Sequence, residues 1–266
     1  MTPSRWSLNA TGSTEAVGLL RIALALIIWA RYARTMSLHT GVEWWTLPLS
    51  AAFFAATTAM LIGYRSQTAT AVTGGILIWL YFGLGVTDVR PLFYGHHAYL
   101  LMAATCLLAL TPCGKSWSLD RWLAIKRGAP TDEIGPLWAQ NLIVLQMASL
   151  YFWTAVDKTG PHFLSGDRLE AIFVWGYTNR PAEVILTLPG LAMAASILVV
   201  VVEYFLAGAI LIRRLAWIAI PTGLALHASF YVLLPVSTYS ISMIALYLAV
   251  IHPDTLRQFL NRMRSG

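Results

Sequence analysis

The chain has 266 residues, of which 58% are hydrophobic and only 11% are charged, and it carries a net charge of +6. Soluble domains average about 25% charged residues, so this composition excludes a soluble globular protein and predicts an integral membrane protein. The basic residues are spread through short loops without a continuous block. This distribution excludes a nucleic-acid-binding surface and points to membrane topology and anionic lipid.

Eight apolar segments follow one another along the chain. The length of each is close to the about 20 residues that a helix needs to cross a bilayer. The sixth is longer and should tilt or turn near Pro189 and Gly190, and the seventh is interrupted at Pro221. The predicted spans are 15–32, 47–64, 68–86, 91–110, 137–156, 181–212, 215–234 and 236–251. They predict an all-α polytopic bundle of about eight transmembrane helices, forming a single transmembrane domain over residues 1–266 with no separate soluble domain.

Polar segments separate these spans. The loop 112–135 contains the stretch 118–126, which predicts a short interfacial amphipathic helix capped by Ser118. The loop 159–182 opens with a Thr-Gly-Pro break and continues into an amphipathic piece that begins at Leu164. A basic tail closes the chain.

The distribution of Lys and Arg predicts the orientation. With the N-terminus inside, eleven basic residues fall on the inner side: Arg5, Arg65, Lys115, Arg121, Lys126, Arg127, Arg213, Arg214, Arg257, Arg262 and Arg264. Six fall on the outer side: Arg31, Arg34, Arg90, Lys158, Arg168 and Arg180. We therefore expect a bacterial inner-membrane protein with both termini in the cytoplasm and with His96, His97 and Lys158 near the outer face.

Arg21, Glu203 and His227 are ionisable residues placed well inside the apolar segments. A bare charge in hydrocarbon is costly, so these side chains should face the bundle interior and find protein partners. Arg21 and Glu203 are expected either to form a buried ion pair that fixes helix packing or to line a polar cavity. His227 fits a satisfied core histidine and a site residue about equally well.

His96 and His97 open the fourth segment. Two adjacent histidines point about 100° apart on a helix, so they do not easily share a metal ion, and no metal site is predicted. Either both are hydrated interfacial residues that cap the segment, or one of the two faces inward as a proton carrier or hydrogen-bond donor. Cys106 and Cys113 read as two small buried residues and not as a disulfide or a metal site.

Asp157 and Lys158 end the fifth segment, directly before the break at Gly160 and Pro161. The simple interpretation is a polar helix end with a lysine that extends to the interface. The functional interpretation is that the break folds Lys158 into a partly dry cavity, where a desolvated amine can act as a general base.

An ordered set of stretches runs through nearly the whole chain: LLRIALALIIW at 19–29, HHAYLL at 96–101, TPCGKSWSLDRW at 111–122, LQMASLYFWTAVDKTGPHFLSGDRL at 145–169, VEYFLAGAILIRR at 202–214, and HASFYVLL with YSISMIALYLAVI between 227 and 251. This order and spacing resemble the bacterial branch of the HTTM (horizontally transferred transmembrane) family. The best-known member of that family is the vitamin K-dependent gamma-glutamyl carboxylase.

The resemblance implies roles for particular residues. Lys158 occupies the position of the carboxylase lysine that deprotonates reduced vitamin K, and His97 matches a histidine near the substrate glutamate. His227, His96 and Tyr151 are the further residues expected to contact the cofactor. The sequence departs from the family in carrying Asp157 where the carboxylase has lysine, and it ends without the large lumenal domain that binds propeptides.

Two functions follow as expectations. The first is a membrane enzyme with carboxylase-like lyase or oxidoreductase chemistry, in which Lys158 and His97 act on a quinol, such as reduced vitamin K, or on another lipid-soluble small molecule at the outer face. The alternative is a non-catalytic membrane partner or maturation factor for a secreted peptide or protein. A small-molecule carrier is disfavoured, because no inverted repeat appears.

Overall fold

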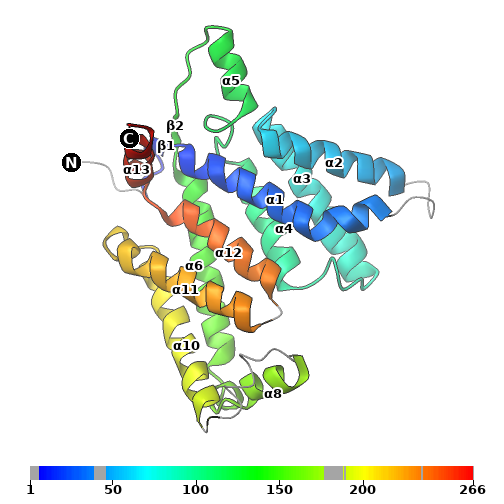
Figure 1. The fold of residues 1–266 in the computed structure, drawn as a ribbon, viewed down its shortest axis with the longest axis vertical. Helices are drawn as coiled ribbons and strands as arrows, with labels where there is room; N and C mark the ends of the chain where they lie inside the picture. The colour runs from blue at the N-terminus through cyan, green and yellow to red at the C-terminus, as the bar shows by residue number, and fades with distance from the viewer. Residues whose placement is uncertain (1–5, 39–45, 177–187, 189, 235, 266) are drawn as a thin grey trace. The chain divides into compact units, whose positions relative to one another are not determined.

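The computed structural model describes the chain except for residues 1–5, 39–45, 177–187, 189, 235 and 266. The described residues form helices and one two-stranded sheet, so the prediction of an all-α membrane bundle is confirmed (Figure 1). The chain divides into two compact units. Unit 1 comprises residues 1–143 and 251–266, and unit 2 comprises residues 144–250. That the two units form the single transmembrane domain expected from the sequence stays a prediction.

The count of eight spans is not met. Four helical segments of the described chain are long and apolar enough to cross a membrane, namely Glu15–Ser37, Ser66–Thr87, Leu191–Ala209 and Arg213–Leu233. Three further apolar helices are shorter, Thr46–Ile62, His96–Ala109 and Ser237–Val250. The fourth predicted span loses its first turn because residues 91–95, which include Pro91 and Gly95, form a turn instead of a helix.

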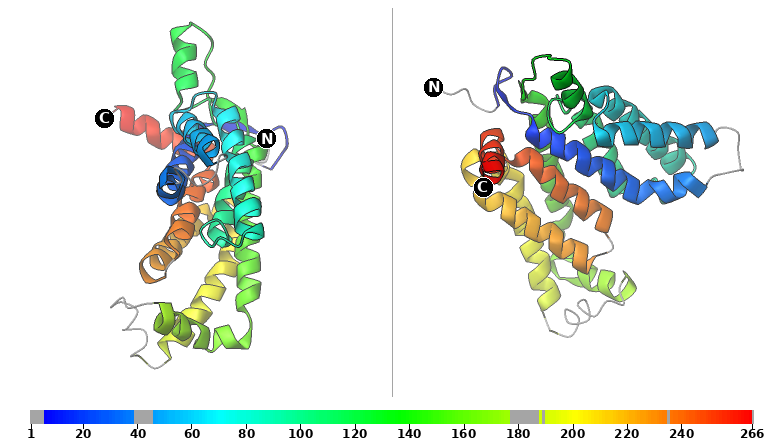
Figure 2. Two further views of the ribbon diagram at one scale, coloured as in Figure 1. Left: turned by 90° about the vertical axis from the view of Figure 1, so that its right-hand side faces the viewer. Right: turned by 45° about the horizontal axis from the view of Figure 1, so that its top comes forward.

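Unit 1 is built from four apolar helices and the polar segments that join them. Its elements are β1 (Thr11–Ser13), α1 (Glu15–Leu38), α2 (Thr46–Ile62), α3 (Ser66–Trp79), η1 (Leu80–Thr87), α4 (His96–Ala109), α5 (Leu119–Lys126), β2 (Ile134–Pro136) and α13 (Pro253–Ser265). Helices α1, α2, α3 and α4 pack against one another, as the two views of Figure 2 also show. The π-helix η1 continues α3, so the third predicted span is one long segment.

Arg21 of α1 is fully buried in unit 1, where its two terminal nitrogens have protein partners. Its Nη1 donates to Ser66 Oγ at 3.0 Å and its Nη2 to the Trp117 carbonyl at 2.5 Å. Asp120 accepts hydrogen bonds from the backbone N–H and the hydroxyl of Ser66, both at 2.8 Å. Gly63, at φ +75°, approaches the guanidinium so closely that a Cβ there would overlap it. The buried charge thus ties α1 to the start of α3 and to the loop before α5.

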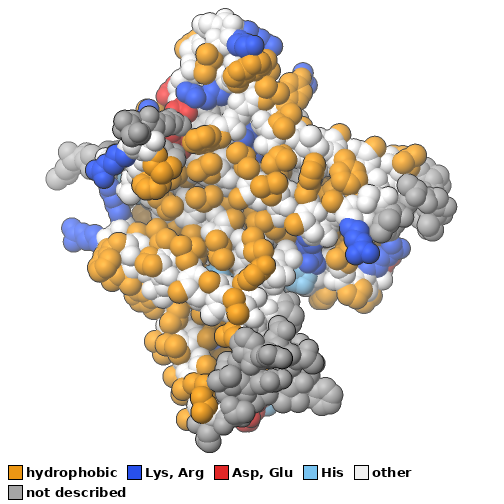
Figure 3. All heavy atoms as spheres, viewed as in Figure 1, with side chains coloured by type: hydrophobic (Ala, Val, Ile, Leu, Met, Phe, Trp, Pro, Cys, Tyr) orange, Lys and Arg blue, Asp and Glu red, His pale blue; other side chains and the backbone are white. Residues whose placement is uncertain are grey.

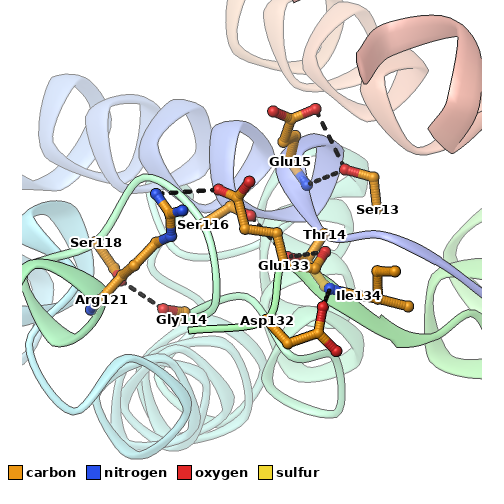
Figure 4. A network of polar contacts seen from close by, with 10 residues as sticks. All are labelled: Ser13, Thr14, Glu15, Gly114, Ser116, Ser118, Arg121, Asp132, Glu133 and Ile134. Carbon is orange, nitrogen blue, oxygen red and sulfur yellow. Dashed lines mark hydrogen bonds and ion pairs between the residues drawn. The ribbon is translucent and has the colours of Figure 1, made fainter. Parts of the chain in front are cut away.

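A polar network joins the start of α1 to the long loop that carries α5 (Figure 4). The Thr14 hydroxyl lies 2.7 Å from Ser116 Oγ and donates to the Glu133 carbonyl at 3.0 Å. The Glu133 side chain forms an ion pair with Arg121 at 3.2 Å. The predicted cap is confirmed, because Ser118 Oγ accepts from the Arg121 backbone N–H.

Strands β1 and β2 pair antiparallel, with Gly12 opposite Gly135, and α13 packs on β1 and on α1. The sequence analysis predicted neither this small sheet nor a helix in the basic tail. The pairing brings together the segment before α1, the end of the loop 112–136 and the C-terminal helix. Three segments that were predicted to share one membrane side therefore meet at one end of unit 1.

Unit 2 contains most of α6 (Trp138–Lys158), whose first residues belong to unit 1, followed by α7 (Pro161–Leu164), α8 (Asp167–Gly176), α10 (Leu191–Ala209), η2 (Arg213–Leu215), α11 (Ala216–Leu233) and α12 (Ser237–Val250). Helix α6 ends at Lys158, and Gly160 caps α7 with Pro161 in its first turn. The predicted break is confirmed. Pro221 does not interrupt α11, which continues on both sides of it.

The sixth predicted span is shorter than expected. Helix α10 begins after Gly190, in agreement with the predicted turn there, while Pro189 and residues 181–187 lie outside the described residues. In Figure 3, hydrophobic side chains cover most of the helix faces seen in that view, and charged side chains gather toward helix ends and at α5. Such an exposed apolar surface suits helices whose surroundings are lipid.

Candidate functional site

An ion pair between α6 and α10 holds the predicted base. Lys158 Nζ lies 2.5 Å from Glu203 Oε1. Glu203 is 3% exposed, whereas the Lys158 side chain retains 24% exposure. The ammonium group also lies 5.9 Å and 5.8 Å from the ring centroids of Phe163 and Phe230, within the range of cation–π contacts. Lys158 is therefore held in one place at the end of α6.

A second polar group in unit 2 links α6, α11 and α12. Tyr151 Oη lies 2.7 Å from His227 Nε2 and 2.8 Å from Tyr247 Oη, and all three side chains are buried. Gly223 makes this geometry possible, because a Cβ at that position would overlap the Tyr247 hydroxyl. The hydroxyl of Tyr151 is thus the centre of a hydrogen-bonded chain with a histidine at one end.

The tautomer of His227 follows from its partners. Nδ1 is buried and has no hydrogen-bond partner among the described residues. If Nε2–H donates to Tyr151, Nδ1 is an unused acceptor. The other tautomer would bury an unused N–H donor, and orphaned buried donors are the rarer of the two. We therefore assign the Nε2–H tautomer, with Tyr151 donating in turn to Tyr247.

The two polar groups share one aromatic neighbour. The His227 ring lies 5.8 Å from the Phe230 ring, over which Lys158 Nζ also sits at 5.8 Å. Tyr151 and Lys158 are seven residues apart on α6, which places them on one face of that helix. Lys158, Glu203, Tyr151, His227 and Tyr247 are called the unit 2 cluster below.

An apolar cavity lies beside the unit 2 cluster. Its volume is about 450 Å³, within the range of small-molecule sites, and residues of α8, α10 and α11 line it. Phe230 belongs to this lining, and its ring also contacts Lys158 and His227. Most of the other lining residues are Leu, Val and Ala, while Thr222 and Ser229 supply hydroxyl groups. The arrangement joins an apolar space to a lysine and a histidine.

The two predicted histidines of the fourth segment lie in unit 1. They open α4 directly after Gly95, with His96 exposed and His97 half-buried. Tyr151 and His227, the other two predicted cofactor residues, lie with Lys158 in unit 2. That His97 and Lys158 act on the same substrate stays a prediction.

The outcome for the buried charges is mixed. The prediction that Arg21 and Glu203 lie inside the protein with protein partners is confirmed. The alternative in which they pair with each other is wrong, because Arg21 bonds Ser66 and the Trp117 carbonyl while Glu203 pairs with Lys158.

Sequence reasoning missed Tyr247 and the role of Glu203. A usable signal was present, since polar residues recur seven apart on two helices: Ser196 with Glu203, and Ser240 with Tyr247. That spacing marks one polar helix face.

Asp157 is exposed, so it points away from the buried pair. Within the described ranges, no three His, Cys, Asp or Glu side chains group as a metal site would require.

The comparisons with known proteins identify the family. The family model described as the HTTM domain matches residues 15–254. The match covers most of the chain, so the protein belongs to the HTTM-domain family. No curated protein and no solved structure matches it.

Proposed function

We propose that this HTTM-domain membrane protein is an enzyme in which Lys158 acts as a base toward a quinol, or a similar lipid-soluble molecule, at the outer face of a bacterial inner membrane. The observation that carries the proposal is the position of Lys158. Its amine lies against the buried Glu203 and over Phe230, a side chain of the apolar cavity. A base toward an apolar substrate must be both partly desolvated and next to the space that the substrate occupies.

Because Lys158 is paired with Glu203, it must lose a proton before it can act as a base. The ion pair with Glu203 is made by the ammonium form of Lys158, whereas a base needs the neutral amine. The ammonium proton must therefore move to Glu203 or leave by another group before Lys158 can accept a proton from substrate. Glu203 is well suited to take it, because a carboxyl at 3% exposure is better tolerated when neutral than as an unpaired anion.

The cavity fits the ring and chain of a quinol. Its lining is largely aliphatic and aromatic, and the hydroxyl groups of Thr222 and Ser229 could hold one polar substituent. A quinol, when bound, supplies a weakly acidic hydroxyl group as the proton donor. Residues of α8, α10 and α11 would exclude water, and Lys158 would receive the proton. The assisting role of His97 rests on the family resemblance.

The experiment compares wild-type protein with Lys158→Arg and with Lys126→Arg, a matched change on the exposed helix α5. Arginine can keep the ion pair with Glu203 but cannot act as a base near neutral pH. A quinol that has lost its proton to Lys158 can be oxidised by dissolved dioxygen, which accepts its electrons. Wild-type protein and Lys126→Arg should therefore retain a quinone after purification, detected by mass spectrometry, and should take up oxygen when reduced menaquinone is added. Lys158→Arg should retain the quinone and fold but show no uptake.

The opposite result is equally clear. If wild-type protein retains no quinone and shows no quinol-dependent oxygen uptake, the enzyme proposal is refuted. The ion pair between Lys158 and Glu203 would then serve only helix packing, as other buried pairs do. Stable co-purification of a secreted peptide that survives Lys158→Arg would favour the alternative, a non-catalytic maturation partner.

A further inference from the structure

The C-terminal helix α13 has one apolar face that the protein only partly covers. Phe259 and Met263 lie three and seven residues after Leu256, so the three side chains share one face of the helix. Leu256 is buried at 8% exposure, while Phe259 and Met263 are 57% and 63% exposed. The helix therefore docks through its first turn and leaves two large apolar side chains outside the protein.

The rest of α13 is polar and basic. Its sequence holds Arg257, Arg262 and Arg264 against a single acidic residue, Asp254. Asn261 lies about 180° from the mean direction of the apolar side chains, and it is exposed. An apolar stripe flanked by arginines is the pattern of helices that lie in the plane of a membrane surface.

Connectivity and contacts place α13 at the level where spans leave the membrane. It begins three residues after the apolar helix α12 ends at Val250. It also packs on β1 and α1, and β1 ends two residues before the apolar helix α1 begins at Glu15. The neighbour of α13 along the chain and its neighbour in space are therefore both ends of apolar helices. At that level, the apolar medium available to Phe259 and Met263 is the edge of the lipid.

We propose that α13 docks on the surface of an anionic phospholipid bilayer, with Phe259 and Met263 in the outer part of the acyl region and with Arg257 and Arg262 at the headgroup phosphates. Charge complementarity selects this occupant over another protein surface. Arginines on a helix next to a membrane attract the anionic lipids of the inner leaflet. This proposal does not depend on the enzyme proposal, and it also assigns the inner membrane face to this end of unit 1.

The test uses the full chain with Cys106 and Cys113 replaced by alanine and a single new cysteine at position 259, 263 or 261. Each variant carries an environment-sensitive nitrobenzoxadiazole label and is placed in phosphatidylcholine nanodiscs with or without phosphatidylglycerol. Labels replacing Phe259 and Met263 should shift to shorter emission wavelength and be quenched by lipids with a nitroxide near the headgroup. The label replacing Asn261 should remain accessible to iodide in water.

A charge variant tests the headgroup contacts. Arg257→Gln combined with Arg262→Gln should remove the additional quenching that phosphatidylglycerol produces at position 263. Arg213→Gln combined with Arg214→Gln removes the same charge from η2 and should leave that quenching unchanged. Two results overturn the proposal. One is water accessibility at positions 259 and 263 in phosphatidylglycerol nanodiscs. The other is protection of both positions from iodide without quenching by the headgroup nitroxide, which would assign the face to a protein partner or a second copy.

Discussion

Breaking the Lys158–Glu203 pair should destabilise the protein, and the loss of Lys158 should be worse than the loss of Glu203. Glu203 is 3% exposed, so a carboxylate left without its lysine cannot rehydrate. The Lys158 side chain is 24% exposed and stands at the end of α6, so an ammonium group left without its glutamate can turn toward water. Lys158→Met therefore leaves a buried carboxyl that must either stay charged without a partner or take up a proton, whereas Glu203→Gln leaves an ammonium group that can reach water.

The distance between the two charges and their burial set the size of the expected loss of stability. Two unit charges 2.5 Å apart attract by about 7 kcal/mol at an effective dielectric constant of about 20, but the desolvation of both ions offsets most of this. Removing one partner of a buried pair costs about 3–5 kcal/mol. We expect about 3 kcal/mol for Lys158→Met, and about 1 kcal/mol for Glu203→Gln because its lysine partner rehydrates.

The double variant measures the coupling energy between Lys158 and Glu203 apart from the cost of losing either side chain alone. Lys158→Met combined with Glu203→Gln strands no charge, so its cost should fall below the sum of the two single costs by about 2 kcal/mol. Equilibrium unfolding in mixed micelles, followed by far-ultraviolet circular dichroism, measures all three, and Lys126→Met on α5 is the control. Additive single costs, or a larger loss for Glu203→Gln than for Lys158→Met, would refute the reasoning.

Two further predictions use other parts of the fold. Gly223→Ala should lower the free energy of unfolding by about 1–3 kcal/mol, because the new methyl group overlaps the Tyr247 hydroxyl, while Gly208→Ala, with no atom within 4 Å of its new Cβ, should not destabilise. A gain in stability for Gly223→Ala in the same unfolding assay would contradict this. Cys113 is 0% exposed, and burial raises the pKa of its thiol, so maleimide should label it at neutral pH only after unfolding. Rapid labelling of Cys113 in folded Cys106→Ala protein would count against the packing described for unit 1.

Much of the fold follows from local sequence. Long apolar runs predict most of the helices of the described residues, the Ser118 cap predicts α5, and the Gly160–Pro161 break predicts the end of α6. Helix α13 was missed because its charge marked it as a tail, although its apolar residues repeat with helical spacing. The count of spans was too high because apolar composition does not show where a turn, such as 91–95, shortens a helix.

The pairing of charges could not be predicted in the same way. Lys158 and Glu203 are 45 residues apart, and Arg21 was an equally plausible partner for Glu203 on charge alone. What decides between them is geometry. Arg21 donates to a hydroxyl and a carbonyl within unit 1, and the carboxylate of Asp120 binds the same Ser66 side chain.

The interior of unit 2 carries more hydrogen-bonding capacity than its own residues use. Ser196 Oγ, Ser240 Oγ and His227 Nδ1 are buried and have no hydrogen-bond partner among the described residues. Ser196 stands seven residues before Glu203, and Ser240 seven before Tyr247, so each faces the same way as a member of the unit 2 cluster. A buried polar atom without a partner costs about 1–3 kcal/mol. Apolar residues of similar volume would pack a purely structural bundle without that cost. Water or a polar part of a bound molecule would remove it.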